Sequence, residues 1–223
     1  MSAELLEARR EPGPQVPVPA VTFQAPRGRQ VVRVLSLALK RAIDIAASVA
    51  GLILLSIPFV LIWLVVVCTS PGPALFWSIR VGRDGRPFRM PKFRTMRCGV
   101  SLRPREELVL REYDYTPIGR LLRRTSLDEL PQLFSVIAGD MSIIGPRPLL
   151  ASDPAARERL NFPAALSVRP GISGLAQVNG RNGVTPRRKA RLDALYARSV
   201  CLRVDALLLA KTLVIIVNGK GFL

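Results

Sequence analysis

A long apolar run near the amino-terminal end limits the folds that this chain can adopt. From Ile45 to Cys68 the sequence is almost wholly apolar, and after Asp44 no charged residue appears until Arg80. About twenty consecutive apolar residues are enough to cross a bilayer as a helix. We therefore expect this segment to be helical and inserted into a membrane.

Ser56 and Pro58 interrupt the middle of this run. A proline removes a helical hydrogen bond and bends the chain, and a nearby serine can satisfy the backbone groups that are set free. Two arrangements are compatible with such a break: a single kinked span, or a re-entrant hairpin that enters and leaves by the same face of the membrane.

The charges that flank the run distinguish these two arrangements. Basic residues lie on both sides of it: Arg27, Arg29, Arg33, Lys40 and Arg41 before it, and Arg80, Arg83, Arg86, Arg89, Lys92, Arg94 and Arg97 after it. Because Lys and Arg concentrate on the cytoplasmic side of a membrane segment, both flanks are expected in the cytoplasm, which favours the hairpin. Asp44 has the helical spacing to pair with Lys40 or Arg41 where the chain enters the interface.

Composition restricts the chemistry that the chain can perform. It carries 33 Lys and Arg against 16 Asp and Glu, a net charge of +17, and no histidine. The positive charge predicts an anionic partner, and the lack of histidine excludes Ser-His-Asp triads and His-containing zinc sites. Three widely spaced cysteines indicate neither a metal site nor a disulfide framework.

The chain divides into three parts by composition. Residues 1–32 are rich in proline and lack apolar periodicity, which predicts a disordered tail. Residues 33–69 form the expected membrane hairpin, and residues 70–223 the expected cytoplasmic catalytic domain.

The catalytic part combines one strand pair with several helices. The stretch "PALFWSIRVGRDGRPFRMPKFRTM" predicts a β-hairpin that turns at Asp84-Gly85. Apolar periodicity predicts helices over residues 118–124, 126–138 and 187–199, and the apolar residues 204–217 are too few to span a bilayer, so they pack or lie at the interface. The expected fold class is α+β and mainly helical, with a membrane helix-break-helix, amphipathic interfacial helices and a small β-hairpin.

The stretch "RRTSLDELPQLF", residues 123–134, has two interpretations. Ser126 and Glu129 have the spacing of a capping box, in which Asp128 and Glu129 merely complement the positive end of the helix dipole. Alternatively the two carboxylates perform chemistry there. Pro131 cannot donate a hydrogen bond to the Leu127 carbonyl, so we expect a loosened first turn.

Two loops have the residue types of anion-binding sites. Arg147 stands between two prolines in "GDMSIIGPRPLL", which constrains the direction of its guanidinium group. The stretch "RPGISGLAQVNGRNG" combines glycines, which let backbone amides approach phosphate oxygens, with arginine and amide side chains. A plain glycine-rich surface turn is the alternative.

Taken in order, four motifs resemble the bacterial sugar transferase family. They are "KRAIDI", "TSPGPALFWSIRVGRDGRPFRMPKFRTM", "LRRTSLDELPQLFSVIAGDMSIIGPRPLL" and "RPGISGLAQVNGRN", and the resemblance covers residues 38–221. The family comprises monotopic phosphoglycosyl transferases, and the chain resembles its small members, which carry the catalytic domain only.

The resemblance implies a role for each singled-out residue. Asp128 and Glu129 fall on the catalytic dyad, where Asp128 attacks the β-phosphate of a UDP-sugar, forms an aspartyl phospho-sugar and releases UMP before undecaprenyl phosphate takes the sugar phosphate. Mg²⁺ is the implied cofactor, with Asp128 as its ligand. The implied phosphate-binding residues are Arg123, Arg124 and Arg147. The implied nucleotide-sugar-binding residues are Arg169, Pro170, Gly171, Gln177, Asn179 and Arg181.

The resemblance also implies a location and partners. The partners would be a UDP-sugar, undecaprenyl phosphate and a lipid bilayer, at the cytoplasmic face of a bacterial inner membrane, in the first membrane step of a surface polysaccharide or glycoconjugate pathway.

Three features depart from the family pattern. Ile57 separates Ser56 from Pro58, Pro91 replaces an aromatic residue, and a tryptophan is missing from "RSVCLRVD".

Two other functions are compatible with parts of this sequence. A membrane-tethered protein that binds nucleic acid or acidic lipid would explain the charge. Aromatic residues are only 6% of the chain and no binding motif is present, so we expect no nucleic-acid partner. A glycosidase needs two carboxyl groups that face each other across a bond, which adjacent helical residues do not provide.

The flanking charges generate a topological prediction. In a background without cysteine, Gln30→Cys and Val100→Cys should both resist a membrane-impermeant label applied from the periplasmic side, because both flanks are expected in the cytoplasm. Labelling of one position alone would demonstrate a full span.

Overall fold

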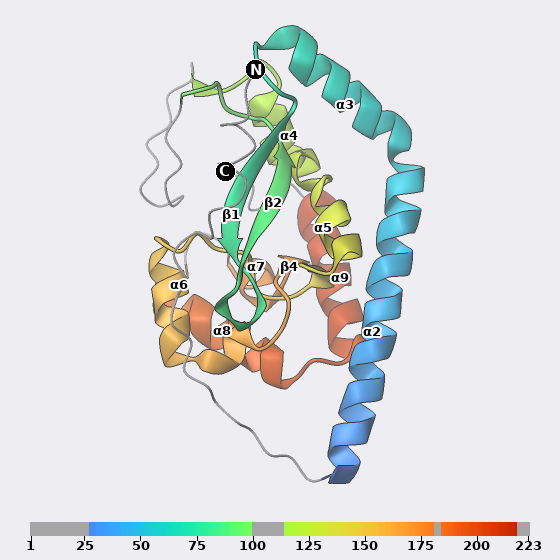
Figure 1. The fold of residues 1–223 in the computed structure, drawn as a ribbon, viewed down its shortest axis with the longest axis vertical. Helices are drawn as coiled ribbons and strands as arrows, with labels where there is room; N and C mark the ends of the chain where they lie inside the picture. Colours follow the sequence, from blue (N-terminus) through green and yellow to red (C-terminus); the bar gives the residue numbers. More distant parts are fainter. Residues whose placement is uncertain (1–26, 100–113, 181–183, 218–223) are drawn as a thin grey trace, which may run out of the picture.

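The computed structural model describes residues 27–99, 114–180 and 184–217, so the expected tail up to residue 26 and Arg181 lie outside the described residues. The fold is mainly helical with a small β-hairpin, which confirms the α+β class (Figure 1). The helices are α2 (Arg27–Leu54), α3 (Ser56–Thr69), α4 (Gly119–Thr125), α5 (Gln132–Ala138), α6 (Pro154–Glu158), α7 (Leu175–Val178), α8 (Pro186–Arg198) and α9 (Leu202–Val217). The strands are β1 (Leu75–Val81), β2 (Pro87–Phe93), β3 (Ser142–Ile144) and β4 (Gly171–Ser173).

The apolar run forms two helices joined at a sharp bend. Helix α2 starts at Arg27, before the boundary expected at residue 33, and α2 and α3 meet at Leu55 with a bend of 64°. Ser56 and Pro58 occupy the first turn of α3, so the chain bends where the sequence places the break. Within the described residues, no single helix is long and apolar enough to cross a membrane, whereas this bent pair together meets both criteria.

Two arginines hold the middle of α2 and the chain just after α3 to the rest of the molecule. Arg41 of α2 donates to the Val136 and Ile137 carbonyls at the end of α5, at 2.6 and 3.1 Å. Arg94, which is buried, donates to the carbonyls of Ser70 and Gly72 just after α3, at 2.8 and 3.1 Å. Each guanidinium therefore binds backbone carbonyls at or just beyond the end of a helix.

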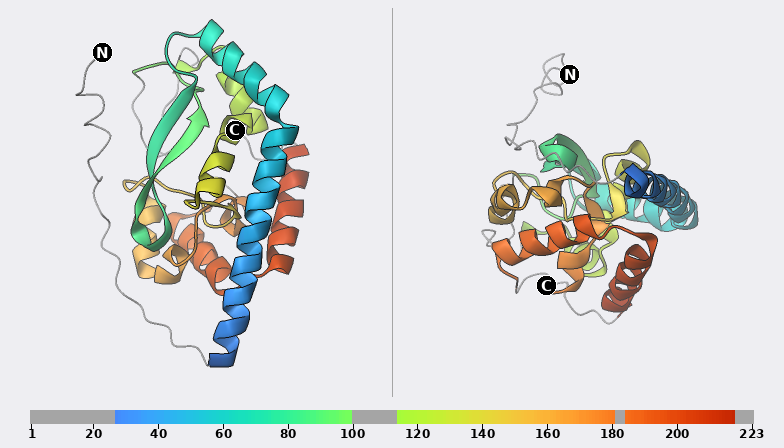
Figure 2. Two further views of the ribbon diagram at one scale, coloured as in Figure 1. Left: turned by 45° about the vertical axis from the view of Figure 1, so that its right-hand side comes forward. Right: turned by 90° about the horizontal axis from the view of Figure 1, so that it is seen from below.

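A buried polar network fixes α2 against the carboxy-terminal half. Lys40 lies 3.6 Å from Asp44, which confirms the predicted pairing, and 2.6 Å from Asp205 of α9. Asp44 also accepts hydrogen bonds from the Ser142 hydroxyl at 2.7 Å and the Ile143 amide at 3.3 Å, both in β3. Figure 2 shows α5 beside α2. The long helix is thereby tied to the strand that precedes Arg147.

The β-hairpin forms as predicted. β1 and β2 pair antiparallel, with Ser78 opposite Met90 and Arg80 opposite Phe88. Asp84 and Gly85 both adopt positive φ, 56° and 74°, in the turn between the strands, a conformation that glycine and aspartate tolerate better than most residues.

The capping box predicted at Ser126 is wrong. Ser126 adopts a left-handed conformation with φ of 58°, ends α4, and makes no side-chain capping hydrogen bond. Residues Leu127–Glu129 form a separate turn of 3₁₀ helix, η4, and the α-helix begins only at Gln132, directly after Pro131. The loosened first turn of a helix expected around the dyad is therefore wrong: Pro131 cannot donate to the Leu127 carbonyl, and the regular helix starts only after it.

The parallel strands β3 and β4 approach unusually closely at two glycines. A Cβ atom on Gly171 would lie 2.0 Å from the Gly145 amide nitrogen, so only glycine fits there. Gly171 donates its amide to the Pro146 carbonyl at 2.8 Å. This packing fixes the backbone on the amino-terminal side of Arg147.

A buried ion pair fixes the same segment from the other side. Arg159, in the 3₁₀ turn η5 (Arg159–Asn161), lies 2.6 Å from Asp193 of α8, and both side chains are only 3% exposed. Arg159 also donates to the Arg147 carbonyl at 2.9 Å.

Removing one partner of this pair should destabilise the protein strongly. Asp193→Ala leaves the Arg159 cation buried without a counter-charge, which should lower the free energy of unfolding by about 3–5 kcal/mol. Urea unfolding in detergent micelles would measure this, with the exposed Asp140→Ala as control. Equal stability of the two variants would contradict the prediction.

Candidate active site

The two adjacent carboxylates lie in η4, which packs against strand β2. The turn between α4 and α5 carries Asp128 into the interior, where it is 8% exposed. Lys92 of β2 lies 2.5 Å from a Glu129 carboxylate oxygen and 3.9 Å from one of Asp128. One ammonium group therefore neutralises part of the charge of both carboxylates.

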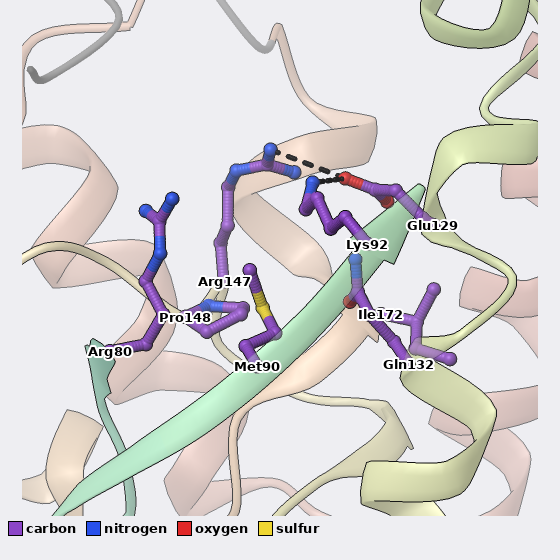
Figure 3. A pocket seen from close by; sticks show the side chains of 8 residues that line it. All are labelled: Arg80, Met90, Lys92, Glu129, Gln132, Arg147, Pro148 and Ile172. Atoms are coloured by element: carbon purple, nitrogen blue, oxygen red, sulfur yellow. Dashed lines mark hydrogen bonds and ion pairs between the residues drawn. The ribbon is translucent and has the colours of Figure 1, made fainter. Parts of the chain in front are cut away.

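A polar pocket opens beside this pair (Figure 3). It is lined by Arg80, Met90, Lys92, Glu129, Gln132, Arg147, Pro148 and Ile172. Arg147 reaches towards Glu129, with a nitrogen-to-oxygen distance of 3.5 Å. Two cationic side chains, Lys92 and Arg147, thus reach the Glu129 carboxylate, and Arg80 lies farther from it in the same pocket.

The environment of Asp128 acts on its ionisation in two directions. Burial raises the pKa of the Asp128 carboxyl, and the neighbouring Glu129 raises it further. Lys92, Arg123 and Arg147 oppose this shift by stabilising the charged form, but the net direction is upward. Above this raised pKa, Asp128 is a carboxylate beside the pocket, and burial makes its charged form less stable than in water.

Gln132 contributes a buried polar group to the pocket wall. It is 1% exposed, lies one turn after the dyad, and its Nε2 atom has no hydrogen-bond partner among the residues that the structure describes. Leaving a buried amide without a hydrogen-bond partner costs about 1–3 kcal/mol. Such unsatisfied groups are typical of sites where a ligand completes the hydrogen bonds.

The arginines expected to bind phosphate separate in the structure. Arg147 lines the pocket. Arg123 turns towards the end of β2, where it donates to the Thr95 hydroxyl at 3.0 Å and to the Met96 sulfur at 2.9 Å. Arg124 is exposed at the end of α4. The structure therefore brings only Arg147 of these three to the pocket beside the dyad.

Residues of the glycine-rich loop contribute mainly to backbone support. Arg169 donates to the Gly139 carbonyl at 2.7 Å, and Pro170 accepts a hydrogen bond from the Ser142 amide at 2.9 Å. Gln177 donates to the Ile172 carbonyl at 2.9 Å and so supports a residue of the pocket wall. Asn179 is exposed and donates to the Leu175 carbonyl at 2.8 Å.

Arg80, Lys92 and Gln132 line the pocket, although the sequence motifs do not assign them to the site. In the sequence Arg80 and Lys92 stand out only as charges that flank the apolar run. The hairpin register shows that these two residues share a face. Arg80 lies opposite Phe88 and Lys92 opposite Phe76, so both point to the face of Ser78 and Met90. No comparable pattern distinguishes Gln132 from a core residue of α5.

Comparison with known proteins identifies the family. The sequence profile described as bacterial sugar transferase matches residues 35–219. The chain is a member of the bacterial sugar transferase family.

Its relatives in this family include larger proteins. It is 37% identical over 198 residues to an undecaprenyl-phosphate galactose phosphotransferase of Salmonella typhimurium, which covers 82% of the chain and 41% of that protein. It is 34% identical to a UDP-glucose:undecaprenyl-phosphate glucose-1-phosphate transferase of Klebsiella pneumoniae, over 98% of the chain and 46% of that protein. An uncharacterized sugar transferase of Bacillus subtilis, EpsL, is 35% identical over 82% of the chain and 89% of its own length. The chain thus spans less than half of the length of the first two relatives.

The carboxylates of this family member fit a magnesium ion only in company with a ligand. Among the described residues no group of three or more Asp, Glu, Cys or His side chains is placed to hold a metal ion. Mg²⁺ commonly binds through one or two carboxylates together with substrate phosphates. Asp128 and Glu129 satisfy that weaker requirement.

The raised pKa of Asp128 generates a stability prediction. Folding disfavours the ionised carboxyl, so the neutral amide of Asp128→Asn removes this penalty wherever the wild-type group is ionised, which is above the raised pKa. At pH 8 the variant should unfold at the same temperature as the wild type or higher. The advantage should shrink as the pH falls through the raised pKa.

Thermal unfolding in detergent micelles across this pH range would measure the difference. Asp140→Asn, an exposed aspartate, is the matched control and should show no such gain. A clearly lower unfolding temperature for Asp128→Asn at pH 8 would mean that the carboxylate stabilises the fold.

Proposed function

We propose that the protein transfers a sugar 1-phosphate from a UDP-sugar to undecaprenyl phosphate and releases UMP. The Salmonella and Klebsiella relatives are named for transfer of galactose and glucose phosphates to this lipid. The observation that carries the proposal to this chain is the buried Asp128 carboxylate beside a pocket lined by Arg80, Lys92 and Arg147.

The first half-reaction forms a covalent intermediate on Asp128. A carboxylate oxygen attacks the β-phosphorus, and the bond from that phosphorus to the bridging oxygen breaks. The bridging oxygen and its electron pair leave as part of UMP, and an aspartyl phospho-sugar remains. A desolvated carboxylate is a suitable nucleophile because it has little hydration to lose.

The second half-reaction regenerates the enzyme. A phosphate oxygen of undecaprenyl phosphate attacks the same phosphorus, the acyl–phosphorus bond breaks, and Asp128 leaves as a carboxylate. Lys92 and Arg147 would stabilise negative charge on the transferring phosphoryl group. Glu129 orients both cations through the contacts at 2.5 and 3.5 Å.

A magnesium ion would neutralise the diphosphate and polarise the bond that breaks. Asp128, with Glu129 beside it, would hold the ion together with phosphate oxygens. The residues Arg169, Pro170, Gly171, Gln177, Asn179 and Arg181 keep their proposed role around the nucleotide, in which the Ile172 contact of Gln177 supports the pocket wall.

The proposed setting is the cytoplasmic face of the bacterial inner membrane, with α2 and α3 as a re-entrant hairpin. Supporting this, the apolar residues that flank the bend are the most exposed of the pair: Ile53, Leu54 and Ile57 are 71, 80 and 72% exposed. Leu207, Leu213 and Val214 expose an apolar surface on α9, which suits a helix lying at the interface.

A direct test follows release of UMP by the purified protein from a panel of UDP-sugars, with undecaprenyl phosphate and Mg²⁺. Mass spectrometry without the lipid should find a phospho-sugar adduct on the peptide that contains Asp128. Asp128→Asn should lower transfer by about three orders of magnitude or more because an amide cannot serve as the nucleophile. Glu129→Gln should impair turnover without abolishing it.

The control Asp140→Asn should retain wild-type rates, since its side chain is exposed and outside the pocket. Full activity of Asp128→Asn, or an adduct on a different peptide, would refute the proposed mechanism.

A further inference from the structure

Arg80 is a pocket residue without an assigned role. It extends from β1 on the same face of the hairpin as Ser78, whose hydroxyl accepts a hydrogen bond from its Nε at 3.0 Å. In Figure 3, Arg147 lies between Arg80 and the carboxylate of Glu129. The pocket therefore has a reacting end at the dyad and a second end formed by two arginines.

The two arginines form a like-charge pair that the neighbouring carboxylates neutralise only in part. Among the described residues Arg80 has no ion pair within 4.0 Å, and Arg147 reaches Glu129 only at 3.5 Å. Burial and the adjacent Arg147 lower the pKa of Arg80 to about 10, although Asp153 and Glu129 oppose the shift. Two guanidinium groups held side by side in a pocket supply bidentate donors, and a phosphate group satisfies both their hydrogen bonds and their charge.

The geometry of phosphoryl transfer determines which phosphate lies there. The attacking and leaving oxygens are roughly in line across the phosphorus. When Asp128 attacks, the leaving α-phosphate of UMP must lie on the side away from the dyad. When Asp128 itself leaves, the entering acceptor phosphate must approach from that same side.

We propose that Arg80 and Arg147 form one phosphate subsite that both half-reactions share. In the first it binds the α-phosphate of the departing nucleotide, and in the second it binds the phosphate of the lipid acceptor. This inference rests on the proposed transfer reaction. It adds that the two phosphate monoesters, UMP and the lipid phosphate, compete for the same two side chains.

The test compares Arg80→Gln and Arg80→Lys with Arg89→Gln. Arg89 is the matched control because it lies in the same hairpin but is exposed, with its guanidinium 5.4 Å from the Trp77 ring centre. Three quantities are measured on the full-length protein in detergent: the affinity for UMP, the rate of UMP release from UDP-sugar without lipid, and the rate at which undecaprenyl phosphate discharges the preformed adduct.

For Arg80→Gln, each of the three quantities should fall about tenfold or more, the typical effect of losing one charge-assisted hydrogen bond. Arg80→Lys should recover part of each loss, because it keeps the charge but not the bidentate geometry. The unfolding temperature of Arg80→Gln should not fall, since the substitution relieves repulsion from Arg147. Undecaprenyl phosphate should displace UMP from the wild type.

Three results would overturn the shared subsite: UMP affinity in Arg80→Gln equal to that of Arg89→Gln, a loss confined to one half-reaction, or simultaneous binding of UMP and lipid phosphate. Failure of the proposed function is a separate outcome. It is seen when the wild type forms no adduct from any UDP-sugar, whereas UMP binding and its competition with the lipid decide the subsite without turnover.

Discussion

The contact between Lys92 and the two adjacent carboxylates is the constraint on which the site depends. Asp128 and Glu129 follow each other in the chain, so their charges repel, and burial makes the charge on Asp128 harder to keep. The ammonium group lies 2.5 Å from Glu129 and 3.9 Å from Asp128. The ammonium group therefore pairs closely with Glu129 and neutralises the charge of Asp128 less fully. This asymmetry suits a division in which Glu129 orients cations and Asp128 remains available as a nucleophile.

Hydrogen bonds link helix α2 to both segments that flank the pocket. Arg41 binds the carbonyls at the end of α5, the helix that follows the dyad, and Asp44 binds β3, the strand that leads to Arg147. Both contacts come from neighbouring turns of α2. Short hydrogen bonds therefore fix both sides of the pocket relative to α2. If this helix anchors the protein in a membrane, the pocket would lie at a fixed distance from the membrane surface.

Local patterns predicted the elements of this fold well, because their causes are local. The positive-φ turn at Asp84-Gly85, the helix break near Pro58 and the helices around α4 and α8 depend on residues a few positions apart. The capping box failed because two local rules competed at Ser126. Ending α4 required a left-handed residue there, and that conformation is incompatible with the extended backbone of an N-cap.

The site was only partly predictable because charge clusters depend on contacts between distant segments. The dyad and Arg147 stand out by their neighbours in the chain, whereas Arg169 resembles them in sequence yet binds the end of α5. Arg80 and Lys92 reach the site only through the hairpin register. To infer which charges face inward, one must also know that the hairpin packs against η4, and no short motif specifies that contact.

The supporting contacts around Arg147 explain how the protein maintains a pocket with excess positive charge. Arg80 and Arg147 repel each other, so an unsupported loop would relax by moving Arg147 into solvent. The Gly145–Gly171 approach and the flanking prolines fix its backbone on one side. On the other side the buried Arg159, neutralised by Asp193, donates to the Arg147 carbonyl. The repulsion between the two arginines is thus opposed by contacts of the rigid backbone around Arg147. A phosphate that enters the pocket is attracted by both arginines, and its binding does not have to order their side chains.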